Sequence, residues 1–320
     1  MRRFLKSESG AVVIWIVAAL LLAAVSAPWL YTGGKSLSAA AETGQLPGVL
    51  EWLGAACGRS DFDRYFSRAL LASALLLMPL LIRRVRALGA GQPVAGLVKL
   101  PWSTALFQIA AGCLIAGGML WALGAVLEEL GAYVPKSKPV AFGKLLGKIA
   151  IPALVVPLLE EWLFRGLLLG LWLRFAKAPA ACIGTSLFFA FVHFLKLPEG
   201  EIIADPASPL AGIALLGKVL GHFTDPQFFV TDFATLFFIG MILAWARLRT
   251  GALWFSIGLH AGWIAVFKGF NMLHSAVDHH PLRPWWVGES LRSGLLPLLT
   301  LALTAALCHL VLSRTNRASP

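Results

Sequence analysis

Long apolar runs dominate this chain and constrain its fold more than any other feature. A run of about 20 apolar residues matches the thickness of the hydrocarbon core of a bilayer. Helices are the default spanning structure, because each helix satisfies its own backbone hydrogen bonds. The sequence therefore predicts an all-α fold, a polytopic membrane helical bundle with about eight transmembrane helices. The predicted spans are 11–31, 66–82, 103–127, 149–172, 179–195, 231–247, 252–268 and 293–312.

Charged residues are scarce for a chain of this length. They make up 13% of the 320 residues, whereas soluble domains carry roughly 25%. The remaining polar side chains are too few to cover a water-facing surface. The net charge of +11 does not indicate nucleic-acid binding, because the basic residues lie at the ends of predicted helices. The four cysteines show no metal or redox spacing.

Basic residues in short loops predict the orientation of the helices. With both termini in the cytoplasm, Arg2, Arg3 and Lys6 precede the first span and Arg317 follows the last. The inner loops are much shorter than the outer ones, so their density of basic residues is higher. We therefore predict that both termini are cytoplasmic and that residues 1–320 form a single integral-membrane domain.

The predicted span 149–172 contains three charges that a membrane helix would ordinarily lack. Each costs about 2.5–3.5 kcal/mol at the bilayer centre on insertion scales, so such residues mark a functional interior by default. Glu161 and Arg165 are four positions apart, which favours an ion pair on one helix face. Glu160 points about 100° away from Glu161 and is suited to take a proton from water. Alternatively, the three charges form a structural cluster that holds helices together.

Two further spans each contain one histidine. His193 lies near the end of the span 179–195, and His260 lies between Gly258 and Gly262 in the span 252–268. Glycines at these positions would let another helix or a substrate backbone approach closely. Counted at about 1.5 Å per residue, Glu160, His193 and His260 lie at a similar depth, so we predict that they converge. A lone membrane histidine can also serve only as an interhelical hydrogen-bonding residue.

Three motifs in this order resemble a known family. Residues 160–165 fit Glu-Glu-x-x-x-Arg, Phe189 and His193 fit Phe-x-x-x-His, and His260 begins the third motif. Together they resemble the CPBP family, the CAAX protease and bacteriocin-processing group also called Abi, over about residues 145–270. The resemblance implies an intramembrane endopeptidase in a bacterial inner membrane. Its substrate would be a membrane-associated protein or peptide, such as a prenylated CAAX tail, a bacteriocin leader or a sorting tail.

The resemblance also implies a role for each motif residue. Glu160 and His193 would activate the attacking water, His260 would stabilise the oxyanion, and Glu161 with Arg165 would form a supporting pair. One position departs from the family, whose third motif usually reads His-x-x-x-Asn or Asp. Ile264 occupies the last position here and offers no side-chain hydrogen bond. Asn271, further along the same segment, is a candidate substitute.

Other functions fit parts of the pattern. Glu160, His193 and His260 would also make a catalytic zinc site, but the chain has no His-Glu-x-x-His motif, and we expect no cofactor. A non-proteolytic transporter or partner scaffold would explain Ile264. The shortage of polar residues along the other helices argues against transport, since an ion path needs several polar steps. A membrane acyltransferase fits only loosely, because no second motif supports it.

Overall fold

The computed structural model describes residues 7–44, 46–88, 97–137, 140–174, 176–195, 197, 200–288 and 290–315. The terminal basic residues Arg2, Arg3, Lys6 and Arg317 lie outside these ranges, so the cytoplasmic location of both termini stays a prediction. The chain divides into two compact units, each described by itself. Unit 1 comprises Met1–Gln92 and Val192–Asp225, and unit 2 comprises Pro93–Phe191 and Pro226–Pro320. The single domain over residues 1–320 also stays a prediction.

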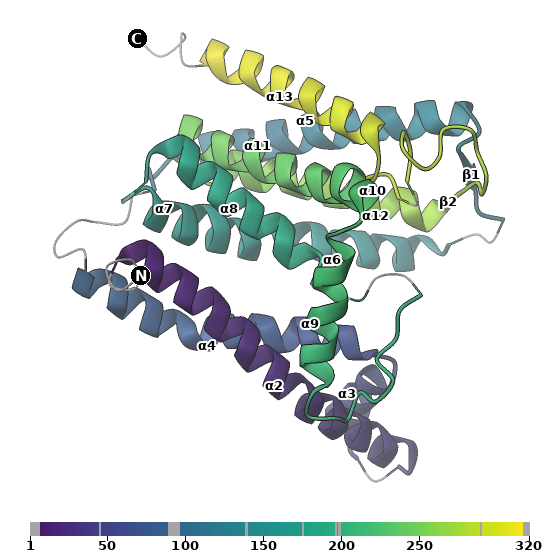
Figure 1. Cartoon of the computed structure of the whole chain (residues 1–320). Coiled ribbons are helices and arrows are strands. Elements are labelled where there is room, and N and C mark those ends of the chain that lie inside the picture. Colours follow the sequence, from purple (N-terminus) through teal and green to yellow (C-terminus); the bar gives the residue numbers. More distant parts are fainter. Residues whose placement is uncertain are drawn as a thin grey trace. The chain divides into compact units, whose positions relative to one another are not determined.

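Unit 1 is built around its first helix. Its helices are α2 (Glu8–Glu42), α3 (Val49–Gly58), α4 (Phe62–Leu88) and α9 (Ala211–His222). Helix α2 packs along α4 and also contacts α3 and α9 (Figure 1). The indole Nε1 of Trp15 donates to the Ala74 carbonyl at 3.2 Å. A Cβ at Gly212 would lie 2.1 Å from the Ala24 carbonyl oxygen, so α9 meets α2 backbone to backbone.

Unit 2 holds the remaining elements and is almost entirely helical (Figure 1). They are α5 (Trp102–Glu129), β1 (Tyr133–Pro135), α6 (Phe142–Glu161), the π-helix η1 (Trp162–Leu168), α7 (Leu169–Trp172), α8 (Ala178–His193), α10 (Pro226–Phe228), the π-helix η2 (Phe229–Phe233), α11 (Ala234–Thr250), α12 (Trp254–Leu273), β2 (His274–Ala276) and α13 (Leu295–Thr315). Helix α8 crosses the boundary between the units, because its last two residues belong to unit 1. Helix α12 packs against α5, α6 and α11.

A short antiparallel strand pair is the one regular element in the described residues that is not a helix. Tyr133 of β1 pairs with Ala276 of β2, and Pro135 pairs with His274. The pair joins the segment after α5 to the segment after α12. The predicted all-α class is therefore correct apart from this pair, which the sequence analysis did not anticipate.

Five helices within the described residues are long and apolar enough to cross a membrane. They are Gly10–Glu42, Phe62–Leu88, Trp102–Glu129, Pro226–Thr250 and Leu295–Ser313. The predicted spans 149–172, 179–195 and 252–268 are helical over 149–172, 179–193 and 254–268, but they are not among the five. Helix α8, for example, has only 16 residues, fewer than the about 20 that a bilayer requires. The total of eight spans thus stays a prediction.

The predicted span 149–172 is helical throughout but changes its winding at the charged motif. Helix α6 includes Pro152 and Pro157 and ends at Glu161, and η1 follows without a break. A single π-turn inside an α-helix is rare and often occurs at a functional site. The winding therefore changes directly after the paired glutamates, and Arg165 lies inside the π segment.

Glycines on both helices bring α12 close to α5. A Cβ at Gly258 would lie 2.2 Å from the Ile109 carbonyl oxygen, and one at Gly262 would lie 2.4 Å from that of Cys113. A Cβ at Gly112 would lie 2.6 Å from the Phe255 carbonyl oxygen. This is the close backbone approach typical of Gly-x-x-x-Gly segments. The close approach predicted for these glycines is therefore made by a helix, and it fixes the segment that carries His260.

We predict that Gly258→Ala destabilises the protein by about 1–3 kcal/mol, the usual cost of overpacking a tight contact. The added methyl would collide with the α5 backbone, which cannot rotate away as a side chain can. The measurement is the unfolding midpoint of the purified protein in detergent. Gly118→Ala is the matched control on α5, because nothing lies within 4 Å of its Cβ position. An unfolding midpoint for Gly258→Ala equal to that of the control would contradict the prediction.

Candidate active site

The paired glutamates end α6, and the arginine follows one turn later. Glu161 and Arg165 are both fully buried, and Arg165 Nη1 lies 3.0 Å from Glu161 Oε1. The ion pair predicted from the four-residue spacing is therefore present. A buried ion pair is stable only when further hydrogen bonds satisfy the remaining polar atoms, so the surroundings of Arg165 matter.

Arg165 is held by two further elements of unit 2. Its Nη2 donates to the backbone carbonyl of Gly240 on α11 at 3.3 Å. The guanidinium carbon lies 4.2 Å from the centre of the Phe189 ring on α8 and 5.7 Å from that of Phe164. Cations within about 6 Å of an aromatic ring face are attracted by the ring quadrupole. The arginine thus links η1 to α8 and α11.

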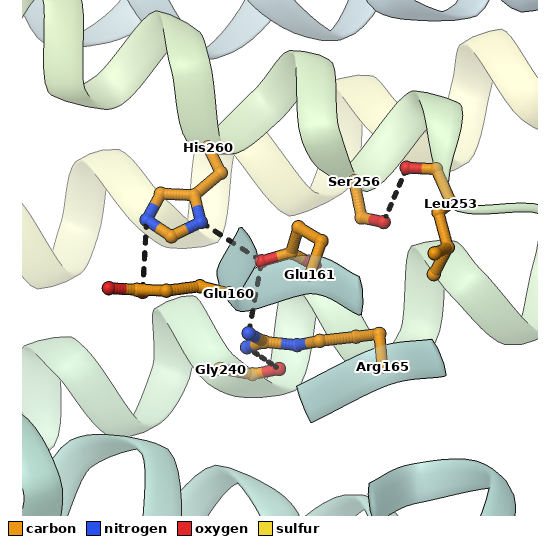
Figure 2. A network of polar contacts seen from close by, with 7 residues as sticks. All are labelled: Glu160, Glu161, Arg165, Gly240, Leu253, Ser256 and His260. Carbon is orange, nitrogen blue, oxygen red and sulfur yellow. Dashed lines mark hydrogen bonds and ion pairs between the residues drawn. The ribbon is translucent and has the colours of Figure 1, made fainter. Parts of the chain in front are cut away.

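His260 lies between the two glutamates, as Figure 2 shows. Its Nδ1 is 2.9 Å from Glu161 Oε1, the same oxygen that accepts from Arg165. As the ion-pair partner of Arg165, this carboxylate oxygen acts as a hydrogen-bond acceptor. The Nδ1 atom must therefore carry a proton and donate it. This contact fixes the orientation of the imidazole and directs Nε2 toward Glu160.

Glu160 approaches the opposite side of the imidazole. Its Oε2 lies 3.8 Å from His260 Nε2, beyond hydrogen-bond distance, and a water molecule can bridge polar atoms at such a separation. The Glu160 side chain is 27% exposed, whereas that of Glu161 is 0% exposed. Glu160 and Glu161 therefore differ in their access to other molecules. Glu161 is a buried partner of Arg165 and His260, and Glu160 is the carboxylate that another molecule can reach.

His193 is the third residue predicted to converge with Glu160 and His260. It is the last residue of α8 and belongs to unit 1. Its placement relative to Glu160 and His260 therefore stays a prediction from the sequence. The preceding turn of α8 belongs to unit 2, and there the Phe189 ring meets the His260 ring edge to face at 6.0 Å. The second motif thus contributes Phe189 to the network around Arg165 and His260.

No group of three or more His, Cys, Asp or Glu side chains is arranged to hold a metal ion in the described part of the chain. The donors that unit 2 presents are the Glu160 carboxylate and His260 Nε2, because Nδ1 of His260 is bonded to Glu161. The zinc alternative with Glu160, His193 and His260 would need His193 as the third ligand, so it stays a prediction.

The third motif departs from the family pattern within a continuous helix. Ile264 lies one turn after His260 in α12 and is half-buried. Asn271 is in the same helix, eleven residues from His260, which corresponds to about 16 Å along the axis. Asn271 therefore cannot replace the missing polar group beside His260.

Three features of the network were not predicted from the sequence. They are the hydrogen bond between Glu161 and His260, the carbonyl of Gly240, and the aromatic rings around Arg165. The bond joins residues 99 positions apart, and nothing in either segment specifies the other. A possible signal for Gly240 was a glycine inside an apolar span, since such glycines often mark close helix approach.

Comparison with known protein families supports the resemblance to the CPBP family. Residues 142–266 match the family described as type II CAAX prenyl endopeptidase Rce1-like. Neither the curated proteins nor the solved structures give a match. The matched segment includes all the motif residues, and the resemblance stated from the three motifs is confirmed. Residues 142–266 are thus similar to a family of membrane proteases, and the apolar helices support a multi-pass membrane protein.

We predict that Arg165→Met destabilises the protein by about 3–5 kcal/mol, because it leaves the Glu161 charge buried without its cation. Adding Glu161→Gln in the same chain should recover part of this loss, since glutamine is neutral and still accepts from His260 Nδ1–H. The measurement is the unfolding free energy of the single and double variants in detergent.

Arg249→Met is the control for loss of an arginine. Arg249 is exposed near the end of α11, and such substitutions usually change stability by less than about 0.5 kcal/mol. A double variant as unstable as Arg165→Met alone would show that the buried charge is not the source of the loss.

Proposed function

We propose that this chain is an intramembrane endopeptidase, on the basis of the family match over residues 142–266. It hydrolyses a peptide bond in a membrane-associated protein or peptide. The family implies a peptidase, and the observation that supports a catalytic site in this chain is the position of His260. One ring nitrogen is bonded to the buried Glu161, and the other faces the accessible Glu160.

The reaction proceeds by attack of water on the scissile carbonyl. The Glu160 carboxylate accepts a proton from the water, whose oxygen forms a bond to the carbonyl carbon. The carbonyl oxygen becomes an oxyanion. His260, in the doubly protonated form, donates to it from Nε2–H while Nδ1–H stays hydrogen-bonded to Glu161. Glu160 then gives its proton to the leaving nitrogen as the carbon–nitrogen bond breaks. The carboxylate is thereby regenerated, and the products are an amine and a carboxylic acid.

Glu161 and Arg165 support this chemistry without touching the substrate. The hydrogen bond from Nδ1 to Glu161 keeps the His260 ring in one orientation, as a carboxylate does for a catalytic histidine elsewhere. Arg165 pairs with Glu161 and so offsets the cost of burying this carboxylate. His193 would help Glu160 to position the water, a role that rests on the second motif.

The side chains proposed here act without a cofactor, and a zinc-dependent reaction is the alternative. A zinc ion on Glu160, His193 and His260 would polarise the carbonyl and acidify the water. The two reactions differ in their response to chelators. Persistent cleavage after dialysis against a chelator supports the glutamate reaction, whereas loss that added zinc restores supports the metal.

A prenylated C-terminal CAAX tail is the first substrate class to test, because the matched family is described as CAAX prenyl endopeptidases. The lipid of such a tail would hold it in the bilayer beside the site. The location we propose is a bacterial inner membrane.

A second function is favoured by Ile264. A chain that lacks the polar group of the third motif could retain the family fold as a non-proteolytic transporter or scaffold. Proton-coupled uptake into liposomes by the purified protein, with no cleavage of any membrane peptide, would support this function.

We predict that Glu160→Gln reduces cleavage by about 10²–10⁴-fold, the usual contribution of a general base. His260→Ala should lose about 10²–10³-fold, the usual effect of removing one oxyanion donor, and His193→Ala should also be defective. The assay uses a fluorescent farnesylated CAAX peptide in proteoliposomes. In parallel, the peptide termini of membranes that carry the wild type or Glu160→Gln are compared by mass spectrometry.

Two variants outside the site serve as controls. Glu129 and His309 are both exposed, and Glu129→Gln and His309→Gln should cleave like the wild type. Wild-type cleavage by folded Glu160→Gln would disprove the proposed mechanism.

We predict that Ile264→Asn raises the rate of cleavage. The asparagine amide would add a second donor one turn from His260, and an oxyanion donor is worth about 10²–10³-fold in rate. Ile264→Leu keeps the apolar character and should leave the rate unchanged. A folded Ile264→Asn protein with a rate equal to or below the wild type would mean that the oxyanion site is already complete.

A further inference from the structure

Gly240 on α11 lies against Ser186 on α8. A Cβ at Gly240 would lie 2.9 Å from Ser186 Cβ and 3.1 Å from Ser186 Oγ. Real Cβ atoms are almost never found under 3.0 Å from another heavy atom, so only glycine fits without a shift of the helices. The Ser186 side chain is 1% exposed, and within the described part of the chain its Oγ has no hydrogen-bond partner. Ser186 therefore contacts α11 by van der Waals packing and not through a hydrogen bond.

The same glycine also supports the catalytic histidine through its carbonyl. The Gly240 oxygen accepts from Arg165 Nη2 at 3.3 Å, Arg165 Nη1 donates to Glu161 at 3.0 Å, and His260 Nδ1 donates to Glu161 at 2.9 Å. Figure 2 shows this series of contacts from Gly240 to His260. The guanidinium is a rigid planar fork, so the position of one acceptor constrains the direction in which the other nitrogens point.

Gly240 therefore makes two different contacts, one through its α-carbon and one through its carbonyl. The α-carbon of Gly240 lies against Ser186, and its carbonyl oxygen holds Arg165. A side chain at position 240 would push α11 from α8 and so move the carbonyl relative to the guanidinium. Arg165 would then lose this contact or rotate to follow it, and the Glu161 carboxylate that it holds would move as well.

We propose that Gly240 and Ser186 are positioning residues of the active site, whose contact sets the orientation of the His260 ring through Arg165 and Glu161. Neither residue touches the reacting atoms. The proposal rests on the proposed function only where it concerns catalysis. The orientation of the ring can be measured independently of any activity.

The experiment uses full-length protein in lipid nanodiscs with ¹⁵N-labelled histidine. The ring signals of His260 are assigned by their loss in His260→Gln. Four proteins are compared with the wild type: Gly240→Ala, Ser186→Gly, the double variant, and the control Gly147→Ala, which has nothing within 4 Å of its Cβ position on α6. Cleavage of the farnesylated CAAX peptide is measured on the same samples.

Gly240→Ala should shift the His260 signals and leave those of the other histidines unchanged. Its kcat should fall by up to about 10²-fold, the loss that a misplacement of about 1 Å can cause, with KM unchanged. Ser186→Gly in the same chain should restore both, because it removes the two closest side-chain atoms and leaves only Ser186 Cα at 3.1 Å. Ser186→Gly alone and Gly147→Ala should match the wild type.

A merely structural contact would lower the unfolding midpoint of Gly240→Ala without moving the His260 signals. That result would overturn the proposal, and so would a double variant that stays shifted. If Gly240→Ala does not fold, Arg165→Lys provides the test, because an ammonium group cannot reproduce the fork. Unchanged His260 signals in Arg165→Lys would again overturn it. Shifted signals in a protein whose wild type cleaves nothing would uphold the positioning role and count against the proposed peptidase.

Discussion

The polar network of unit 2 depends on one buried oxygen atom. Glu161 Oε1 accepts hydrogen bonds from both Arg165 and His260, and these contacts join the α6–η1 segment to α12. Without Arg165, the Glu161 carboxylate would be a buried charge with a large desolvation cost. Without Glu161, the Arg165 guanidinium would be an equally costly buried charge. Each charge therefore makes the other tolerable in an apolar interior, and the histidine is fixed by the pair.

This arrangement also explains why two consecutive glutamates are present. Consecutive helix positions point about 100° apart, so the two carboxylates reach opposite sides of the same imidazole. One carboxylate is fully buried and the other is partly exposed. A single glutamate could not both fix the ring and face a substrate.

The features that the sequence predicted correctly are local. The Glu161–Arg165 pair follows from a four-residue spacing, and the close approach at Gly258 and Gly262 follows from the absence of side chains. Long apolar runs predicted helices, because the period and length of such runs are visible in the chain itself. The family resemblance depended on motifs that are also local, and the match over residues 142–266 confirmed it.

The features that were missed depend on tertiary contacts. The π segment after Glu161 and the carbonyl of Gly240 are backbone properties that no residue type specifies. The β1–β2 pair joins segments that are far apart in the chain. His193 shows the same limit, since its predicted convergence with Glu160 and His260 depends on how α8 continues into the other unit.

The glycine contacts of α12 have a consequence for how a peptide could enter. Because the backbones of α5 and α12 touch at Gly258 and Gly262, α12 cannot roll about its axis without carrying α5 with it. The position of His260 is therefore coupled to that of α5. A peptide entering beside Glu160 would therefore meet a histidine whose helix is held in place by its neighbour.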